Sequence, residues 1–112
     1  MKHIIAIVRP EKLDEVRNAL ENIGCSGLMI SEIEGHGKQK GIMQQWRGEK
    51  YNVDLISKIK LEVVVKDSEA EAVKKTIIEK ARTGEIGDGK IFISNIDEVV
   101  RIRTGETGEI AL

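Results

Sequence analysis

Two segments of this chain repeat one pattern, in which a short run of apolar, mostly β-branched residues leads directly into an amphipathic helical stretch. The first covers residues 3–9 with a helical pattern through residue 23, and the second covers residues 59–65 with a helical pattern through residue 81. A further apolar run follows each helix, which allows the chain to return to the same sheet. The sequence therefore predicts two β-α-β units.

Residue types mark the limits of the first helix. Pro10 has a fixed φ and no N–H, so it ends the strand and suits the first turn of a helix. Apolar residues then recur at helical spacing until Gly24, which offers a left-handed stop. The apolar positions of this predicted amphipathic helix are Leu13, Val16, Leu20 and Ile23.

The second helix is expected to begin with a capping box. Ser68 can accept a hydrogen bond from the Glu71 amide, while the Glu71 carboxylate reaches back to the Ser68 N–H. Its apolar positions are Ala70, Val73, Ile77 and Ala81. Apolar or alternating runs predict further strands at residues 28–34, 91–94 and 98–103.

This element order is that of the ferredoxin-like βαββαβ fold (α+β), whose four-stranded antiparallel sheet carries both helices on one face. The 112 residues suffice for one such domain and are too few for two. Residues 4–8 and 61–65 are apolar on both sides, so a monomer would expose a large apolar patch on the second sheet face. We therefore expect subunits that pack sheet to sheet.

About two dozen residues separate the strands at 28–34 and 59–65, which is long for a connection in a compact domain. Several glycines make its root pliable, and Trp46 and Arg47 near its tip are residue types that anchor protein interfaces. We interpret residues 36–55 as a flexible loop that binds a target. A disordered insertion, or a Trp46 that folds back onto the domain, is the alternative.

A candidate anion site is the run 87–90, Gly-Asp-Gly-Lys, together with Arg101 and Arg103. Glycines let backbone N–H groups approach an oxyanion, and Lys and Arg supply positive charge. Arg101 and Arg103 would share one face of the strand at 98–103 because they are two apart. The spacing of a Walker loop is missing, and an ordinary turn beside solvated arginines is the commoner meaning of such a pattern.

Composition and residue spacing argue against a nucleic-acid-binding protein, a disulfide-bonded protein, a metalloprotein, an enzyme and a membrane-spanning protein. The net charge is −1 and no Lys/Arg block is long enough for a nucleic-acid footprint. Cys25 is the only cysteine, which excludes an intrachain disulfide, and His3 and His36 have no partner at metal-ligand spacing. We find no catalytic set, no signal peptide and no stretch near the roughly 20 apolar residues of a membrane span. We expect a soluble, cytoplasmic protein that is not an enzyme.

Three motifs carry a resemblance to a known family. They are Arg47-Gly48-Glu49-Lys50-Tyr51, the run 81–92 around the Gly-Asp-Gly-Lys segment, and the ending 100–109 with its two arginines. Together they resemble the PII nitrogen-signalling family, its GlnB/GlnK group, and the similarity covers the whole chain. The resemblance implies one domain over residues 1–112, assembled as a trimer, with a phosphate-binding loop at 82–90 and a C-terminal segment at 101–112.

The resemblance also implies ATP and ADP sites in the clefts between subunits. Glu62 and Val64 would face the adenosine half. Residues 87–90 would hold the phosphates together with Arg101 and Arg103, and Gly37 and Lys38 would approach the nucleotide from the long loop. The implied nucleotide-binding residues are Gly37, Lys38, Gln39, Glu62, Val64, Gly87, Asp88, Gly89, Lys90, Arg101 and Arg103.

A second implied ligand is 2-oxoglutarate, which members of the family bind through a Mg²⁺ ion held by ATP. Gln39 would complete the metal shell, Lys58 would pair with a carboxylate of the acid, and Lys40 and Gly41 would lie beside it. Mg²⁺ suits this role because it prefers oxygen ligands and bridges phosphates readily. ADP lacks the γ-phosphate and should not support the same assembly.

The implied mechanism is a population shift, in which the bound ligands select one conformation of the 36–55 loop and only one conformation fits the target. In the GlnK branch the target is an ammonium transporter, and an arginine at the loop tip, here Arg47, blocks its cytoplasmic exit. That would recruit the protein to the inner face of the membrane. Glutamine synthetase or another soluble nitrogen-assimilation enzyme is the alternative target.

Modification is a further implied property. Tyr51 matches the tyrosine that enteric-type relatives uridylylate, although a tyrosine does not prove that the modifying enzyme exists. Glu49 rules out the serine phosphorylation of cyanobacterial-type relatives.

Three positions depart from the family pattern. Met29 stands where a hydroxyl residue is common, which puts one hydrogen bond to the nucleotide in doubt. Ser57 replaces a frequent proline at the loop exit, and Trp46 replaces a frequent tyrosine, which would alter the fit to a partner.

Two other functions remain open at this point, one of them enzymatic and the other structural. An acylphosphatase-like enzyme of the same fold would need an arginine and an asparagine aimed at one phosphate; Arg9 precedes Pro10, but no convincing asparagine follows. A CutA-like structural trimer would bind no nucleotide.

Overall fold

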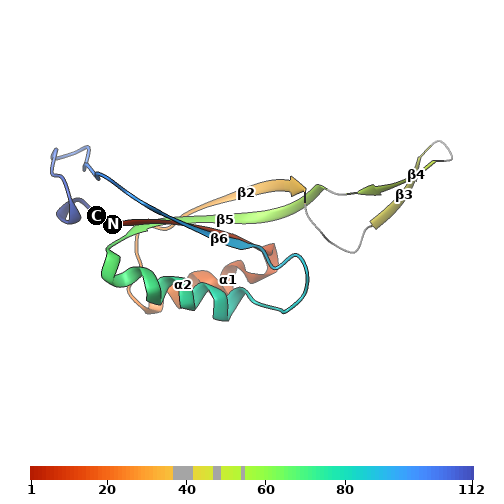
Figure 1. The fold of residues 1–112 in the computed structure, drawn as a ribbon, viewed down its shortest axis with the longest axis horizontal. Coiled ribbons are helices and arrows are strands. Elements are labelled where there is room, and N and C mark those ends of the chain that lie inside the picture. Colours follow the sequence, from red (N-terminus) through yellow and green to blue (C-terminus); the bar gives the residue numbers. More distant parts are fainter. Residues whose placement is uncertain (37–41, 47–48, 54) are drawn as a thin grey trace.

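The computed structural model describes residues 1–36, 42–46, 49–53 and 55–112. Its main sheet is antiparallel with the strand order β2-β5-β1-β6. Figure 1 shows that both helices cover one face of this sheet. The predicted ferredoxin-like arrangement is confirmed. The elements are β1 (Lys2–Val8), α1 (Leu13–Asn22), β2 (Met29–His36), β5 (Leu55–Val65), α2 (Asp67–Ala81) and β6 (Lys90–Asn95).

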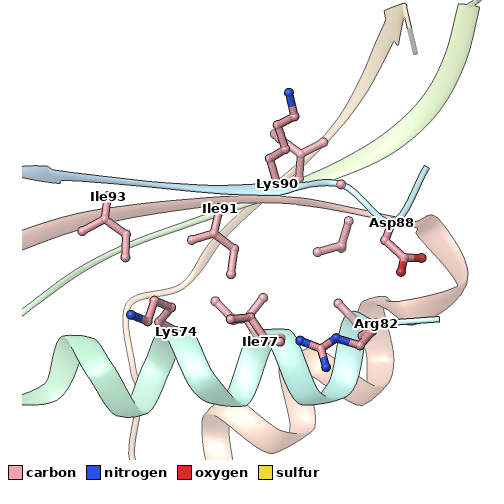
Figure 2. Close-up of a pocket in the computed structure, with 12 residues that line it drawn as sticks. Lys74, Ile77, Arg82, Asp88, Lys90, Ile91 and Ile93 are labelled. Atoms are coloured by element: carbon pink, nitrogen blue, oxygen red, sulfur yellow. The ribbon is translucent and has the colours of Figure 1, made fainter. Parts of the chain in front are cut away.

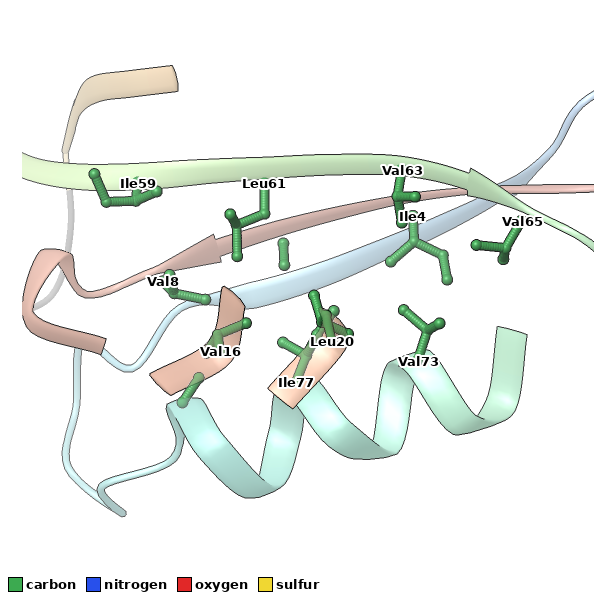
Figure 3. Packing of buried hydrophobic residues seen from close by; sticks show 12 residues of the cluster. Ile4, Val8, Val16, Leu20, Ile59, Leu61, Val63, Val65, Val73 and Ile77 are labelled. Atoms are coloured by element: carbon green, nitrogen blue, oxygen red, sulfur yellow. The ribbon is translucent and has the colours of Figure 1, made fainter. Parts of the chain in front are cut away.

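The hydrophobic core fills the space between the sheet and the helices (Figure 3). Alternate residues of β1 and β5 point toward the helices, as the period of two in a strand requires. Predicted helix positions such as Val16, Leu20 and Ile77 are buried, whereas Ile23 follows the end of α1 and is 48% exposed. The buried residues are Ile4, Ala6, Val8, Val16, Leu20, Ile59, Leu61, Val63, Val65, Val73, Ile77 and Ala81.

The limits of the first helix follow from Pro10 and Gly24, as predicted. Pro10 opens a short 3-10 turn, Pro10–Lys12, and α1 continues from it. Gly24 has φ +84°. Its N–H donates to the Glu21 carbonyl at 3.0 Å, and the next N–H, of Cys25, donates to the Leu20 carbonyl at 2.9 Å. This pair of bonds is a Schellman motif, which satisfies carbonyls at the helix end.

The predicted capping box of the second helix is wrong. α2 begins at Asp67, the N-cap is Lys66, and no side chain caps it. Ser68 therefore lies inside the first turn and not at the cap position. The Asp67 carboxylate instead forms an ion pair with the Met1 amino group at 2.9 Å.

The connection between the predicted strands at 28–34 and 59–65 is more regular than expected. β2 and β5 stay in register as far as Gly35↔Ile56 and His36↔Leu55. Beyond them, β3 (Ile42–Trp46) and β4 (Glu49–Val53) form a separate two-stranded antiparallel sheet that extends past the end of the main sheet (Figure 1). Backbone pairing continues into this segment because strand hydrogen bonds do not depend on the side chains that suggested a loop.

The strand predicted at 98–103 is also wrong. That region contains only an isolated bridge between Val100 and Thr107, and the chain reverses between them. The Gly105 N–H donates to the Arg101 carbonyl at 2.8 Å. Gly105 has φ +73°, a value that glycine adopts without strain and that turns the chain back. Arg101 and Arg103 therefore lie in a turn and share no strand face.

The second face of the main sheet is not covered by any helix of the described chain. One row of paired residues crosses all four strands there: Met29↔Glu62, Glu62↔Ile5 and Ile5↔Phe92. Met29 and Phe92 are each 54% exposed. We call this surface the open sheet face. Its apolar side chains agree with the expected patch and are the reason for expecting a partner subunit on it.

Candidate functional site

The glycine-punctuated turn between α2 and β6 is built around the Asp88 side chain. One carboxylate oxygen, Oδ2, accepts hydrogen bonds from the backbone N–H groups of Thr83 and Gly84, each at 2.8 Å. The other, Oδ1, accepts from the Thr83 hydroxyl and from Arg9 Nε, the latter at 3.0 Å. Residues 83–88 are therefore folded around one carboxylate.

These bonds change the acidity of Asp88. The hydrogen bond from the Thr83 hydroxyl, with further bonds from the Thr83 N–H, Arg9 and the Gly84 N–H, holds the pKa of the Asp88 carboxyl well below its usual range. The group is anionic at neutral pH and its lone pairs are used inside the turn. Asp88 thus shapes the loop in this structure, and its direct contact with a nucleotide stays a prediction.

Arg9 is the main residue here that the sequence did not assign to the binding site. Its Nε binds Asp88, and its NH2 group donates to the Ile86 carbonyl at 2.9 Å. The planar guanidinium can make both bonds at once, which ties the end of β1 to the turn. No local signal could have identified this contact, because the two residues are 79 positions apart.

Gly89 fits the turn because it has no side chain. Its φ is +104°, and a Cβ at this position would meet the carbonyl oxygen of Ile7 at 1.7 Å. The turn can therefore lie against β1 only with glycine here, and it delivers Lys90 to the first position of β6, paired with Ile7.

Lys58 connects the same turn to β5. Its Nζ donates a hydrogen bond to the Gly87 carbonyl. Burial, and then the nearby charge of Arg9, lower the pKa of the Lys58 ammonium, while Glu11 and Asp88 oppose that shift. Lys58, the turn and Arg9 thus form one basic cluster at this end of the sheet, which we call the turn cluster.

An open groove lies beside the turn on the helix side of the sheet (Figure 2). It has a volume of about 370 Å³ between α2 and the edge strand β6. Figure 2 shows Ile77, Ile91 and Ile93 pointing into it, while the Lys90 side chain points away from α2. Lys90 therefore faces the open sheet side, where Glu62 and Val64 of β5, predicted to bind a nucleotide, also lie.

Glu62 and Val64 lie on the open sheet face, as their alternation with buried Leu61 and Val63 requires. The Glu62 carboxylate binds Lys60 Nζ at 3.1 Å and His3 Nε2 at 3.0 Å. The hydrogen bond from Lys60, followed by that from His3, lowers the pKa of Glu62. Lys60 pairs with Ile7, and Ile7 with Lys90, so this polar group continues toward the turn cluster.

The C-terminal segment, residues 96–112, follows the end of β6 that lies away from the glycine turn (Figure 1). Arg101 and Arg103 belong to this segment. β6 runs along β1 from Lys90, which pairs with Ile7, to Asn95, which pairs with Lys2. At 3.3 Å per residue, β6 alone separates the glycine turn from the segment with the two arginines by roughly 17 Å. Arg103 is exposed, and the Arg101 guanidinium binds Glu106 Oε1 at 2.9 Å. A single chain therefore does not bring these arginines to the glycine turn.

Several predicted site residues lie outside the described residues, namely Gly37, Lys38, Gln39, Lys40, Gly41 and Arg47. Trp46 ends β3 and Tyr51 lies in β4, where Gln44 pairs with Tyr51. Their assigned roles stay predictions.

The described ranges contain no group of three or more His, Cys, Asp or Glu side chains that could hold a metal ion. Across the same ranges, no helix is both long and apolar enough to cross a membrane. Cys25 is a half-buried free thiol, and its burial raises its pKa.

The chain is similar to known proteins over nearly its whole length. Residues 1–106 match the family described as nitrogen regulatory protein P-II. The chain is 56% identical over 112 residues to nitrogen regulatory protein P-II 2 of Methanothermobacter thermautotrophicus, covering 100% of this chain and 97% of the relative. It is 55% identical over 108 residues to nitrogen regulatory protein P-II of Rhizobium meliloti, covering 96% of each chain.

Proposed function

The chain belongs to the nitrogen regulatory protein P-II family, and from that membership we propose that it senses ATP, ADP and 2-oxoglutarate and acts on a target through residues 36–55. Proteins of this family are regulatory signal transducers and not enzymes. Membership sets aside the acylphosphatase-like and CutA-like alternatives.

The observation that carries the proposal is the distance between the two halves of the anion site. The glycine turn precedes β6 at one end of the sheet, and the C-terminal segment that contains Arg101 and Arg103 follows β6 at the other end. These groups meet around one ligand only if the arginines come from a second copy. The open sheet face, with Met29 and Phe92 exposed, offers the surface for that association. We propose a homotrimer with three such intersubunit sites.

In this arrangement the turn and Lys90 bind the phosphates, together with Arg101 and Arg103 of the neighbouring copy. Glu62 and Val64 on the open sheet face contact the adenosine half. Gly87 and Gly89 expose backbone to the ligand, and Asp88 keeps the turn in shape through its bonds to Thr83 and Gly84. We propose that Gly37, Lys38 and Gln39 complete the nucleotide site.

We assign the 2-oxoglutarate site to Gln39, Lys40, Gly41 and Lys58. Lys58 already lies beside the turn through its bond to Gly87, so its ammonium is close to the phosphates of the proposed nucleotide. We propose that Mg²⁺ would be held by oxygens of the ligands, with Gln39 as its protein ligand. Mg²⁺ would supply the positive charge that links the triphosphate to the keto-acid.

For the target, we propose an ammonium transporter, as in the GlnK branch, with Trp46 and Arg47 as the contact residues. The protein would then act in the cytoplasm and reach the membrane through this partner. A soluble nitrogen-assimilation enzyme such as glutamine synthetase is the second candidate. Uridylylation of Tyr51 is a further proposal, testable by mass spectrometry of the protein from nitrogen-starved cells.

Titration calorimetry of 2-oxoglutarate into the protein, with Mg²⁺-ATP, with Mg²⁺-ADP or without nucleotide, tests the sensor function, because coupling between two ligands is reciprocal. We expect heat only with Mg²⁺-ATP, and its loss in Gln39→Ala and Lys58→Ala. If ATP binds and 2-oxoglutarate does not, those two assignments are wrong. If neither binds, the proposed sensor function fails.

Light scattering on the same sample tests the trimer, and membrane pull-downs with ADP or with ATP plus 2-oxoglutarate test the transporter. A monomeric protein that still binds ATP would contradict the intersubunit site. Recovery of a soluble enzyme in place of a transporter would favour the second candidate target.

A further inference from the structure

The C-terminal segment reverses direction in a tight turn over residues 102–105, and Glu106 is the residue that follows this turn. The Glu106 carbonyl accepts a hydrogen bond from the Arg101 N–H at 2.8 Å, and the Gly108 N–H donates to the Val99 carbonyl at 3.0 Å. The Glu106 N–H donates to the Thr104 hydroxyl oxygen at 3.2 Å. The backbone of residue 106 is therefore fixed relative to the two arginines.

The Glu106 side chain is aimed at Arg101. Its Oε1 accepts a hydrogen bond from Arg101 NH1 at 2.9 Å and another from the Thr104 hydroxyl at 2.7 Å. Arg101 NH2 donates to the Ile110 carbonyl at 2.8 Å. Arg101 NH2 also lies 3.5 Å from the Leu112 carbonyl oxygen. An arginine has five N–H donors in a rigid plane, so these bonds fix the plane, and the described contacts leave Nε and one NH1 hydrogen for a ligand.

Both Arg101 and Glu106 are partly exposed, with side-chain exposures of 34% and 36%. A ligand phosphate can therefore approach the free donors of the guanidinium. That ligand would also meet the negative charge of the Glu106 carboxylate just behind the guanidinium, and the two anions would repel each other.

We propose that Glu106 is a positioning residue that sets the phosphate affinity of Arg101, since it holds the guanidinium in place and at the same time offsets part of its charge. The inference rests on the proposed nucleotide site and names a residue that the site did not include. The ligand class is a nucleoside di- or triphosphate. The two effects have opposite signs, and two substitutions separate them.

Glu106→Gln keeps an oxygen that can accept from Arg101 and Thr104 but removes the negative charge. We expect it to bind Mg²⁺-ATP and ADP about threefold to tenfold more tightly than the wild type. Glu106→Ala removes the acceptor as well, so the Arg101 guanidinium keeps its NH2 bonds to backbone carbonyls but loses the bond that holds NH1. We expect binding about threefold to tenfold weaker than that of Glu106→Gln, because the ligand must then order the side chain.

The experiment is calorimetric titration of ATP and ADP into the full-length wild type and both variants at several salt concentrations. Removing a charge beside the ligand should make the affinity of Glu106→Gln fall more steeply with added salt. A merely structural role for Glu106 would leave that slope unchanged. Glu109→Gln is the matched control, since Glu109 is an exposed carboxylate of the same segment, and we expect it to bind as the wild type does.

Equal affinities and salt slopes for the wild type and Glu106→Gln would overturn this inference while leaving the nucleotide site intact. The inference also fails if Glu109→Gln matches Glu106→Gln, because the effect would then be one of net charge. Absence of nucleotide binding by the wild type would overturn the proposed function itself, and the role of Glu106 with it. Light scattering on all variants, compared at equal protein concentration, shows whether each keeps the oligomeric state of the wild type.

Discussion

The α-carbon of Gly89 faces the carbonyl oxygen of Ile7 so closely that a Cβ there would lie 1.7 Å from that oxygen. The contact joins the first strand to the turn that begins the last strand. It fixes where the turn lies relative to Arg9, two residues beyond Ile7 on the same chain. The packing of this turn therefore depends on the absence of a Cβ at position 89.

Gly89→Ala should destabilise the protein by at least about 2 kcal/mol, because the new methyl group clashes with backbone and φ +104° is strained for alanine. Urea unfolding followed by circular dichroism, at one fixed protein concentration, measures the loss. Gly84→Ala is the control: its φ is +89°, but a Cβ there meets nothing within 4 Å. We expect it to cost about 1 kcal/mol, from backbone strain alone. Equal losses would contradict the close packing against Ile7.

Asp88→Asn should change the acid sensitivity of the protein. The pKa of Asp88 is lower in the folded state than in the unfolded state, because Thr83, Arg9 and Gly84 donate to its charged form. Its stabilising contribution is therefore complete above the unfolded pKa of about 3.9 and is lost as pH falls below that value toward the folded pKa. Melting temperatures between pH 5 and pH 2, as rough bounds of this window, should fall less steeply in Asp88→Asn than in the wild type. Parallel curves would rule out this role.

Arg9→Lys keeps the charge but not the fork that binds both Asp88 and the Ile86 carbonyl. Losing about 1 kcal/mol of hydrogen bonding should speed amide hydrogen exchange at Thr83 and Gly84 by roughly fivefold to tenfold. Arg17→Lys provides the comparison, since Arg17 pairs only with Asp14 on the exposed side of α1 among the described contacts. Unchanged exchange in Arg9→Lys would show that the turn holds its shape without the guanidinium.

Leu20→Ala and Ile23→Ala test the position of the core on one helix. Leu20 is fully buried, so its truncation should cost about 2–5 kcal/mol. Ile23 belongs to the same predicted apolar face but is 48% exposed, and its truncation should cost less than about 1 kcal/mol. Chemical denaturation of both variants at matched concentration decides this, and similar losses would place Ile23 in the core after all.

Local signals predicted most of the fold. Pro10 and Gly24 marked the limits of α1, and the helical spacing of Val16, Leu20 and Ile77 marked the buried faces. Errors arose where a local signal competed with tertiary contacts. Ser68 carries a capping-box pattern, but the helix starts at Asp67, which pairs with the Met1 amino group.

The sequence by itself determined the order of the two helices and the four main-sheet strands, the helix-facing side of β1 and β5, and the glycine-rich turn, because these depend on residues a few positions apart. Only the tertiary structure decided that Arg9 binds Asp88 and that Lys58 binds Gly87, because strand register brings these distant residues together. It also decided that Arg101 lies at the opposite end of the sheet from that turn. The physical reason is that β6 runs as an extended strand between them, and an extended chain separates its ends by about 3.3 Å per residue.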